Sequence, residues 1–339
     1  MIMIRVKPDV LKNLVSRIFV GLGVPKKDAK ITADVLVTAD LRGIESHGVV
    51  RLPRYINGLK SGLISPIAKI KIIKETPSTL LLDGGKGLGQ IVAYRAMEMC
   101  IKKAKKTGSA WVGVRNSNHY GIAGYYSMMA LKHKMIGISM TNSRPLAVPT
   151  FGRETIIGTN PISLAAPAGK EMPFVLDMAT SVVPIGKIEV ANRKNQKIPI
   201  GWAVDKNGVP TIDPSAVLVG GGVMPLGGEE KFSGYKGYGL SVMVDILSGV
   251  LTGASFLSMV NGDVGHFFGA IRIDAFGSAA QFTKNLDKFI RMLKNSKKAS
   301  GQKRIFIAGE KEFEKEKGYY NKGILLDAKM YKYIKAIKV

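Results

Sequence analysis

The chain has 339 residues, of which 46% are hydrophobic, a formal net charge of +25 and one cysteine, Cys100. This length allows one large or two interleaved domains around a substantial core. A lone cysteine excludes an internal disulfide and indicates a reducing compartment. The first residues lack the apolar run of a signal peptide, so we expect a cytoplasmic protein.

Nucleic-acid binding is the function that such a basic chain first suggests. The cations are mostly lysines spread along the whole chain, without a basic tail or a known nucleic-acid motif. Lysine-rich surfaces also occur in heat-adapted proteins and attract small anionic substrates. We therefore expect no nucleic-acid partner. We also expect no membrane span, because the most apolar window, 240–260, contains Asp245, glycines and small polar residues.

The first 72 residues predict a small helical domain. Apolar spacing indicates helices at 8–22 and 26–42, and a third helix from Val49 to Lys60 after the sequence SHG. We expect the C-terminal helix at 325–339 to join this domain. Residues 73–324 would then form a second domain, which binds cofactor and substrate.

A glycine-rich loop at 84–89 lies between a predicted strand at 79–83 and a predicted helix at 90–106, which a strand at 110–115 follows. This order is typical of dinucleotide-binding units. The glycines do not match G-x-G-x-x-G, however, and no other stretch does. A standard Rossmann domain is therefore not predicted, and a turn that enters a closely packed helix is the favoured interpretation.

The rest of the chain mixes short strands with separated helices. The predicted order is a helix at 121–134, a strand at 136–141, extended segments at 155–166 and 174–178, an irregular stretch at 184–234, a helix at 237–252, a strand at 265–274 and a helix at 279–295, before a lysine-rich C-terminal region. This pattern predicts an α+β fold with a mixed, largely antiparallel sheet, rather than a regular βαβ series.

The four histidines are the first candidates for proton transfer. His133 lies between lysines, and His266 begins an aromatic strand, so structural roles account for both. His47 in ESHG and His119 in NSNHYG lie in polar turns bounded by glycine, where a ring is accessible. A structural role in each turn remains an equal alternative at this stage.

Arginines strengthen the first of these turns as a candidate site. Arg51 and Arg54 are three residues apart on one predicted helix, and Arg51 lies about one turn beyond His47. A guanidinium binds a carboxylate with two parallel hydrogen bonds. A histidine beside such an arginine suits the oxidation of a 2-hydroxy acid. The alternative is a surface helix whose arginines pair with acids elsewhere.

Other chemistries have little support in the sequence. It contains no zinc-binding cluster, no G-x-S-x-G motif and no phosphate loop of the G-x-x-x-x-G-K-[ST] type. We therefore predict no metal site.

Seven ordered segments together resemble the type-2 malate/L-lactate dehydrogenase family. They are RGIESHGVVRLPRY, VRNSNHYGIAGYY, TNSRPLAVP, GTNPISLAAP, FVLDMATS, PIGWAVDKNGVPTIDP and YKGYGLSVMVDILSGVLTGA. The resemblance covers residues 34–327. It implies an NAD- or NADP-dependent oxidoreductase of 2-hydroxy or 2-oxo acids, a cofactor domain that is not of the Rossmann type, a separate helical domain built from both chain ends, and a homodimer.

The resemblance also implies roles for individual residues. His119 corresponds to the proton acceptor and His47 to a second proton-transfer or substrate-binding group. Arg51 corresponds to the carboxylate-binding arginine, with Ser46 beside it, and Arg54 is a further candidate for the substrate. The implied cofactor contacts are Ser143, Asp177, Met178, Ala179, Lys236, Gly309 and Glu310, although Ala308 replaces the proline that usually precedes the last two.

Malate and oxaloacetate are the first substrate pair to expect, because Arg54 and the positive field favour a second anionic group. Sulfolactate, lactate, ureidoglycolate, diketogulonate and cyclic imino acids are alternatives within the family. A basic cluster of Lys187, Arg193 and Lys194 could hold the 2′-phosphate of NADP or form a solvated loop, so both cofactors are expected. The alternative outside the family is an inactive protein that binds anions or nucleic acid.

Overall fold

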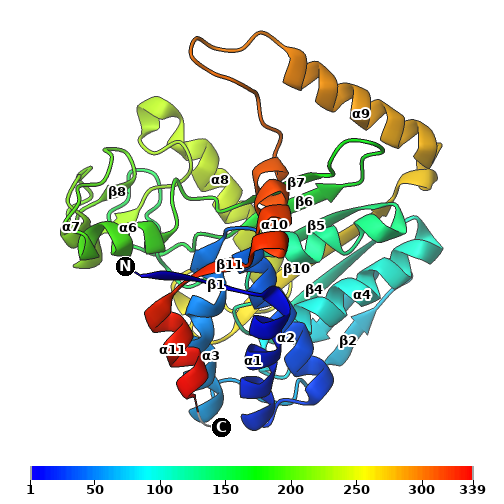
Figure 1. Cartoon of the computed structure of the whole chain (residues 1–339), viewed down its shortest axis with the longest axis horizontal. Coiled ribbons are helices and arrows are strands. Elements are labelled where there is room, and N and C mark those ends of the chain that lie inside the picture. Colours follow the sequence, from blue (N-terminus) through cyan, green and yellow to red (C-terminus); the bar gives the residue numbers. More distant parts are fainter. Residues whose placement is uncertain (1, 338–339) are drawn as a thin grey trace.

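A seven-stranded sheet runs through the middle of the computed structural model, which describes residues 2–337 (Figure 1). In spatial order its strands are β2 (Lys71–Glu75), β3 (Thr79–Asp83), β4 (Ser109–Ser117), β10 (Val264–Arg272), β5 (Met135–Thr141), β6 (Ile162–Ala166) and β7 (Phe174–Met178). Strands β3 and β4 pair in parallel, and the other neighbours pair antiparallel. The predicted α+β fold with a largely antiparallel sheet is confirmed.

Helix α4 (Gly89–Thr107) packs on this sheet and forms its main core. Its residues Ala93, Ala96, Met97, Cys100 and Ala104 recur every three or four positions, and none is exposed to solvent. This spacing places them on one helix face, against the apolar side chains of β4 and β10. The glycine loop at 84–89 enters this helix, as the sequence predicts.

Both ends of the chain meet in one helical region, shown in blue and red in Figure 1. It contains β1 (Met3–Val6), α1 (Pro8–Gly21), α2 (Lys26–Leu41), α3 (Leu52–Lys60), β11 (Ile324–Asp327) and α11 (Ala328–Ala336). Strands β1 and β11 pair antiparallel, so the C-terminal segment joins the N-terminal helices. The predicted C-terminal helix at 325–339 was wrong at its start, because residues 325–327 belong to β11 and the helix begins at Ala328; residues 338–339 lie outside the described residues. The boundary at residue 72 stays a prediction, because Leu88, just before α4, and Ile91 of α4 share this core.

The stretch 184–234 contains more regular structure than the predicted irregular segment. It forms α6 (Ile185–Arg193), α7 (Pro214–Leu218) and a small antiparallel ladder of β8 (Ala203–Val204) and β9 (Gly222–Val223). Ile188, Val217 and Val223 help to form a separate apolar cluster that holds these short elements together. Helix α8 (Gly234–Asp245) follows and continues as a π-helical turn at Ile246–Val250.

The remaining helices differ from prediction in two places. The helix predicted for 121–134 is split into α5 (Ala123–Met128) and a 3-10 turn at Leu131–His133, which Lys134 ends with a left-handed φ of 56°. Helix α9 (Ala279–Asn295) has the predicted bounds, but α10 (Glu310–Lys322) was not predicted. Among residues 2–337, no helix has the length and hydropathy needed to cross a membrane.

Candidate active site

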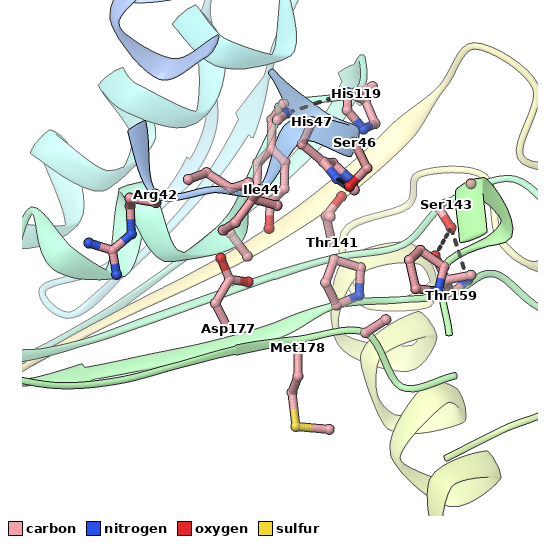
Figure 2. Close-up of a pocket in the computed structure, with 18 of the residues that line it drawn as sticks. Arg42, Ile44, Ser46, His47, His119, Thr141, Ser143, Thr159, Asp177 and Met178 are labelled. Atoms are coloured by element: carbon pink, nitrogen blue, oxygen red, sulfur yellow. Dashed lines mark hydrogen bonds between the residues drawn. The ribbon is translucent and has the colours of Figure 1, made fainter. Parts of the chain in front are cut away.

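A cavity of about 600 Å³ lies between the N-terminal helices, the sheet and the segment before α10. Its lining comes from the turn after α2, from loops that follow β4 and β5, from the end of β7 and from residues 306–309, 311 and 312. Figure 2 shows His47 and His119 on one side of this cavity, with Asp177 and Met178 below them. Residues far apart in the sequence therefore converge on one site.

A buried carboxyl group, Asp40, organises the turn that carries the first candidate residues. Its Oδ2 accepts a hydrogen bond from the Val49 backbone N–H at 2.9 Å. A Cβ at Gly48 would overlap the Asp40 carboxyl group, so only glycine fits between them. Burial raises the pKa of Asp40 to about 8, the Val49 hydrogen bond lowers it, and Glu45 raises it further. The turn forms two 3-10 segments, Glu45–His47 and Val49–Arg51, before α3 begins.

The two candidate histidines stack against each other in the cavity. Their ring centroids are 5.6 Å apart, with an angle of 21° between the planes. The Ser46 hydroxyl oxygen lies 2.9 Å from His47 Nδ1, and the Tyr55 hydroxyl oxygen lies 2.6 Å from His119 Nδ1. The structure thus brings together the two histidines that the family resemblance placed in one pocket.

Burial favours the neutral form of both histidines. Burial lowers the pKa of His47 to about 4, and the nearby Arg51 and Arg54 cations lower it further. Burial also lowers the pKa of His119 well below its ordinary value, with additional contributions from Arg54 and His47. A neutral imidazole has a nitrogen lone pair, so either ring can accept a proton.

Three guanidinium groups line the cavity beside the histidine pair: Arg51, Arg54 and Arg144. Arg51 Nε donates a 2.6 Å hydrogen bond to the Ser46 carbonyl oxygen. Partial burial lowers the pKa of Arg54, as do the nearby Arg144 and Arg51 cations. None of the three forms an ion pair with a carboxylate of the described residues. This end of the cavity therefore suits an anion.

The opposite wall is built from strand ends and has a different character. Asp177 Oδ2 accepts a 2.8 Å hydrogen bond from the Gly124 N–H. Burial raises the pKa of Asp177 to about 6, against the lowering effects of Gly124 and Arg42. Ser143 lies in the loop after β5, where its hydroxyl oxygen accepts a hydrogen bond from the Thr159 N–H at 3.1 Å. These groups present hydroxyl, carboxylate and backbone atoms to the cavity (Figure 2).

Comparison with known proteins agrees with this geometry. The family model for malate/L-lactate dehydrogenase matches residues 6–335. The chain belongs to the malate/L-lactate dehydrogenase family. It is 55% identical to a malate dehydrogenase of Pyrococcus abyssi over 91% of this chain and 87% of that protein. It is 44% identical to an L-sulfolactate dehydrogenase of Methanocaldococcus jannaschii over 98% of this chain and 95% of that one.

Solved structures of the family have the same fold. Malate dehydrogenase from Pyrococcus horikoshii OT3 aligns with a TM-score of 0.91 and 48% identity, over 98% of this chain and 93% of that chain. Malate dehydrogenase from Entamoeba histolytica aligns with a TM-score of 0.95 and 38% identity, over 98% and 97%. The predicted family, and with it an enzyme of the 2-hydroxy acid dehydrogenase class, is confirmed.

Two residues that the family resemblance suggested for the cofactor lie away from the cavity lining. Lys236 is on the exposed face of α8, with its ammonium group 5.9 Å from the Tyr235 ring. Glu310 begins α10, where it pairs with Lys294 at 2.8 Å and accepts a hydrogen bond from the Ile307 N–H at 3.1 Å. Gly309 does line the cavity, as do Ser143, Asp177, Met178 and Ala179.

Several residues of the dehydrogenase cavity were not among the sequence candidates. Arg144 follows Ser143 directly in TNSRP. Its place next to a candidate cofactor residue was the signal from which the sequence could have suggested it. Arg42 directly follows α2, with a side chain only 3% exposed, and it pairs with Glu316 of α10 at 2.9 Å. Its guanidinium also lies 4.4 Å from the Phe313 ring. These contacts link the unpredicted helix α10 to the cavity.

Proposed function

We propose that this family member catalyses reversible hydride transfer between a nicotinamide cofactor and a short 2-hydroxy acid with two anionic groups. Malate and oxaloacetate are the favoured pair, and sulfolactate is the closest alternative in charge. The convergence of Arg51, Arg54 and Arg144 beside the stacked histidines is the observation that carries this proposal. The names of the relatives from Pyrococcus abyssi and Methanocaldococcus jannaschii support it.

Charge balance favours an acid with two anionic groups. Like charges close together in a partly dry site repel one another; burial is the main cause of the lowered pKa of Arg54, and the nearby Arg144 and Arg51 cations lower it further. A lactate-like ion brings one carboxylate to three guanidinium groups, whereas malate brings two. In this proposal, Arg51 holds the carboxylate next to the reacting carbon with its planar fork. Arg54 and Arg144 face the second anionic group.

Proton transfer is assigned to His119, with His47 in an assisting role. Burial lowers the pKa of His119 and so favours its neutral form, which can accept a proton. It therefore takes the hydroxyl proton during oxidation and returns it during reduction. The hydrogen bond between Ser46 and His47 orients the second ring beside the substrate. When bound, the nicotinamide cofactor accepts or supplies the hydride.

The cavity has the properties that such a cofactor requires. Its volume of about 600 Å³ lies within the usual range for ligand sites. A Cβ at Gly186, which lines the cavity, would meet no atom within 4 Å, so the cavity is open at this residue. We propose that Asp177 and Ser143 bind hydroxyl or amide groups of the cofactor, and that Met178, Ala179 and Gly309 contact its surface.

NAD and NADP are both proposed as cofactors. Lys187, Arg193 and Lys194 lie on or next to α6, whose first turn lines the cavity. These cations would favour an additional phosphate. The carboxylates of Asp177 and Glu312 in the lining would instead favour the free hydroxyls of NAD.

A cytoplasmic homodimer is the proposed working form. Leu240, Met243, Ile246 and Val250 recur every three or four residues along α8 and its π-helical extension, and each is between 36% and 54% exposed. Such a row is the kind of surface that a second copy covers. Sedimentation velocity measures this directly, and a concentration-independent monomer would contradict it.

A panel of 2-oxo acids tests the proposed function. Oxaloacetate, sulfopyruvate and pyruvate are each assayed with NADH and with NADPH, by following the nicotinamide absorbance. We expect kcat/KM for the two doubly anionic acids to exceed that for pyruvate by about 10- to 100-fold, in line with the loss of one charge-assisted contact. Failure to oxidise either cofactor with any acid, or a preference for pyruvate, would refute the proposal.

A further inference from the structure

Two Thr-Asn pairs of the sequence meet behind one wall of the cavity. Asn142 follows β5 in the segment TNS, and Asn160 precedes β6 in the segment TNP. Asn142 is 1% exposed and Asn160 is 0% exposed. Their neighbours Ser143 and Thr159 line the cavity and contact each other (Figure 2). The two buried amides therefore lie next to groups that a ligand can reach.

A single carboxylate binds both amides. Asp245, the last residue of α8, is 4% exposed and lies where the π-helical turn begins. Its Oδ1 accepts a hydrogen bond from Asn142 Nδ2 at 3.1 Å, and its Oδ2 accepts one from Asn160 Nδ2 at 3.3 Å. Burial raises the pKa of Asp245, whereas these two hydrogen bonds lower it because they stabilise the ionised form. This amide cluster of Asp245, Asn142 and Asn160 joins the loop after β5 to the loop before β6.

The other atoms of the two amides hold the backbone beside the cavity. Asn160 Oδ1 accepts a hydrogen bond from the Ser143 N–H at 3.0 Å, and Asn142 Oδ1 accepts one from the Gly265 N–H at 2.9 Å. Each Nδ2 also donates to a backbone carbonyl oxygen, at 3.0 Å from Asn160 and 2.7 Å from Asn142. Both amides therefore use their oxygen as an acceptor and their nitrogen as a donor, with no conflict of direction.

The backbone at Asn160 depends on this support. Its φ of 28° lies in the left-handed region, which costs energy for a residue other than glycine. Gly158 packs against the same place, because a Cβ there would overlap Asn160 Oδ1 and both oxygens of Ser143. The close fit leaves Ser143 little room to move relative to Asn160.

The Ser143 hydroxyl keeps a proton for a ligand in the cavity. Its oxygen accepts a hydrogen bond from the Thr159 N–H at 3.1 Å. The two acceptors within its reach, the Arg144 carbonyl oxygen and Thr159 Oγ1, are each 3.5 Å away, where a hydrogen bond is weak. The hydroxyl can therefore donate to a ligand without losing a strong contact.

We infer that Asp245 is a positioning residue that holds Ser143 and Arg144 at the cavity wall through the two amides of the cluster. Asp245 itself lies outside the lining, whereas Ser143 and Arg144 both belong to it. This inference rests on the proposed function, which assigns Ser143 to the cofactor and Arg144 to the second anionic group of the substrate. Loss of the carboxylate should therefore weaken cofactor binding and substrate selection together.

The substitution Asp245→Asn tests the inference with little change of shape. Asparagine has one side-chain oxygen for two amide donors, so one hydrogen bond of the cluster is lost. We expect the Kd of NADH and NADPH, measured by nicotinamide fluorescence, to rise about 10-fold. At saturating cofactor, kcat/KM should fall about 10-fold for oxaloacetate and less than about threefold for pyruvate, because Arg144 is displaced from the second anionic group. A merely structural role would not change the ratio between the two acids.

A double-mutant cycle shows whether Asp245 acts through Ser143. Ser143→Ala removes the hydroxyl that the cluster positions. If Asp245 acts on the cofactor through this hydroxyl, the double variant should bind NADH within about threefold of Ser143→Ala alone. A general loss of structure would instead multiply the two effects.

Asp287→Asn is the matched control. Asp287 is also a buried carboxylate, 5% exposed, but it accepts its hydrogen bonds from Gly169, Lys170 and Glu171 and lies outside the cavity lining. Its cofactor Kd and its ratio of kcat/KM for the two acids should stay at the parent values. Asn160→Gly is the second test variant, because glycine adopts a positive φ without strain and only the amide is lost. It should change the cofactor Kd and the acid ratio in the same direction as Asp245→Asn, and it serves if that variant does not fold.

Two results would overturn the inference. One is an unchanged cofactor Kd and acid ratio in a folded Asp245→Asn or Asn160→Gly variant, and the other is a double variant whose Kd change is the product of the two single changes. A parent that binds cofactor but reduces no 2-oxo acid would refute the proposed function, and the Kd values would still test the contact between Asp245 and Ser143. A parent that binds neither cofactor would refute both.

Discussion

Replacement of Asp40 by asparagine should stabilise the protein at alkaline pH. Asp40 is 2% exposed, and its pKa is raised from an ordinary value of 3.8 to about 8. The folded chain therefore holds this proton more tightly than the unfolded chain. The stability that results is complete below about pH 4 and is lost as the pH rises towards about 8.

The expected magnitude follows from the same two values. Between about pH 5 and pH 9 the parent should lose on the order of 4 kcal/mol of unfolding free energy through this group alone. Asparagine cannot ionise, and its carbonyl oxygen can still accept the Val49 N–H. The variant should therefore match the parent near pH 4 and exceed it by a few kcal/mol near pH 9.

Urea unfolding of both proteins at several pH values measures this difference. Asp287→Asn is a control in which the pKa shift of the carboxyl group has the opposite sign. The Asp287 carboxylate accepts hydrogen bonds from the Gly169, Lys170 and Glu171 N–H groups, and these lower its pKa. Its stabilisation is present above its unfolded pKa and is lost in acid, so this variant should be weakened most near neutral pH. A stability difference for Asp40→Asn that does not vary with pH would refute the reasoning.

Three further substitutions test the turn and the arginines. Gly48→Ala should lower the unfolding free energy by about 2–4 kcal/mol in urea titrations, because the Cβ of the new alanine overlaps the Asp40 carboxyl group. A loss below about 0.5 kcal/mol would contradict the tight fit between Gly48 and Asp40. Arg51→Lys should raise KM for oxaloacetate about 10- to 100-fold in steady-state assays and leave the cofactor Kd unchanged, because the planar fork is lost; an unchanged KM would place the carboxylate site elsewhere. Arg144→Met should lower kcat/KM for oxaloacetate about 10- to 100-fold and for pyruvate less than about threefold; equal losses for both acids would remove Arg144 from substrate selection.

Elements with a strong local pattern could be predicted from the sequence. The strand at 79–83 and the helix at 279–295 have the predicted bounds, because apolar periodicity and turn residues mark both ends. The segments that were missed depend on distant partners. Strand β1 pairs with β11, with Met3 opposite Asp327, and a short isolated strand has no local signal of such pairing. Helix α10 is rich in charged residues, so it has a weak apolar pattern, and it is held against the rest of the fold by its contacts with Arg42.

The candidate site was predictable to the extent that the family motifs name its residues. From residue spacing alone, a structural role was as good an explanation for His47 and His119 as a catalytic one. Their stacked rings become visible only in the folded structure. The sequence does not show that the Tyr55 hydroxyl contacts His119, because this partner comes from a distant loop. The sequence also does not show that Asp40 is buried, since a carboxyl group on an amphipathic helix usually faces solvent. Here it is buried to hold the turn.

Transfer of a labelled hydride to oxaloacetate tests the central claim most directly. NADH or NADPH that carries deuterium at both C4 positions is mixed with oxaloacetate and excess enzyme, and the product is analysed by mass spectrometry. The account predicts malate with one deuterium at C2 from the parent protein, and formation about 10²- to 10⁴-fold slower from His119→Ala, which lacks the proton-transfer group. The absence of labelled malate from the parent, or an equal rate from His119→Ala, would contradict it.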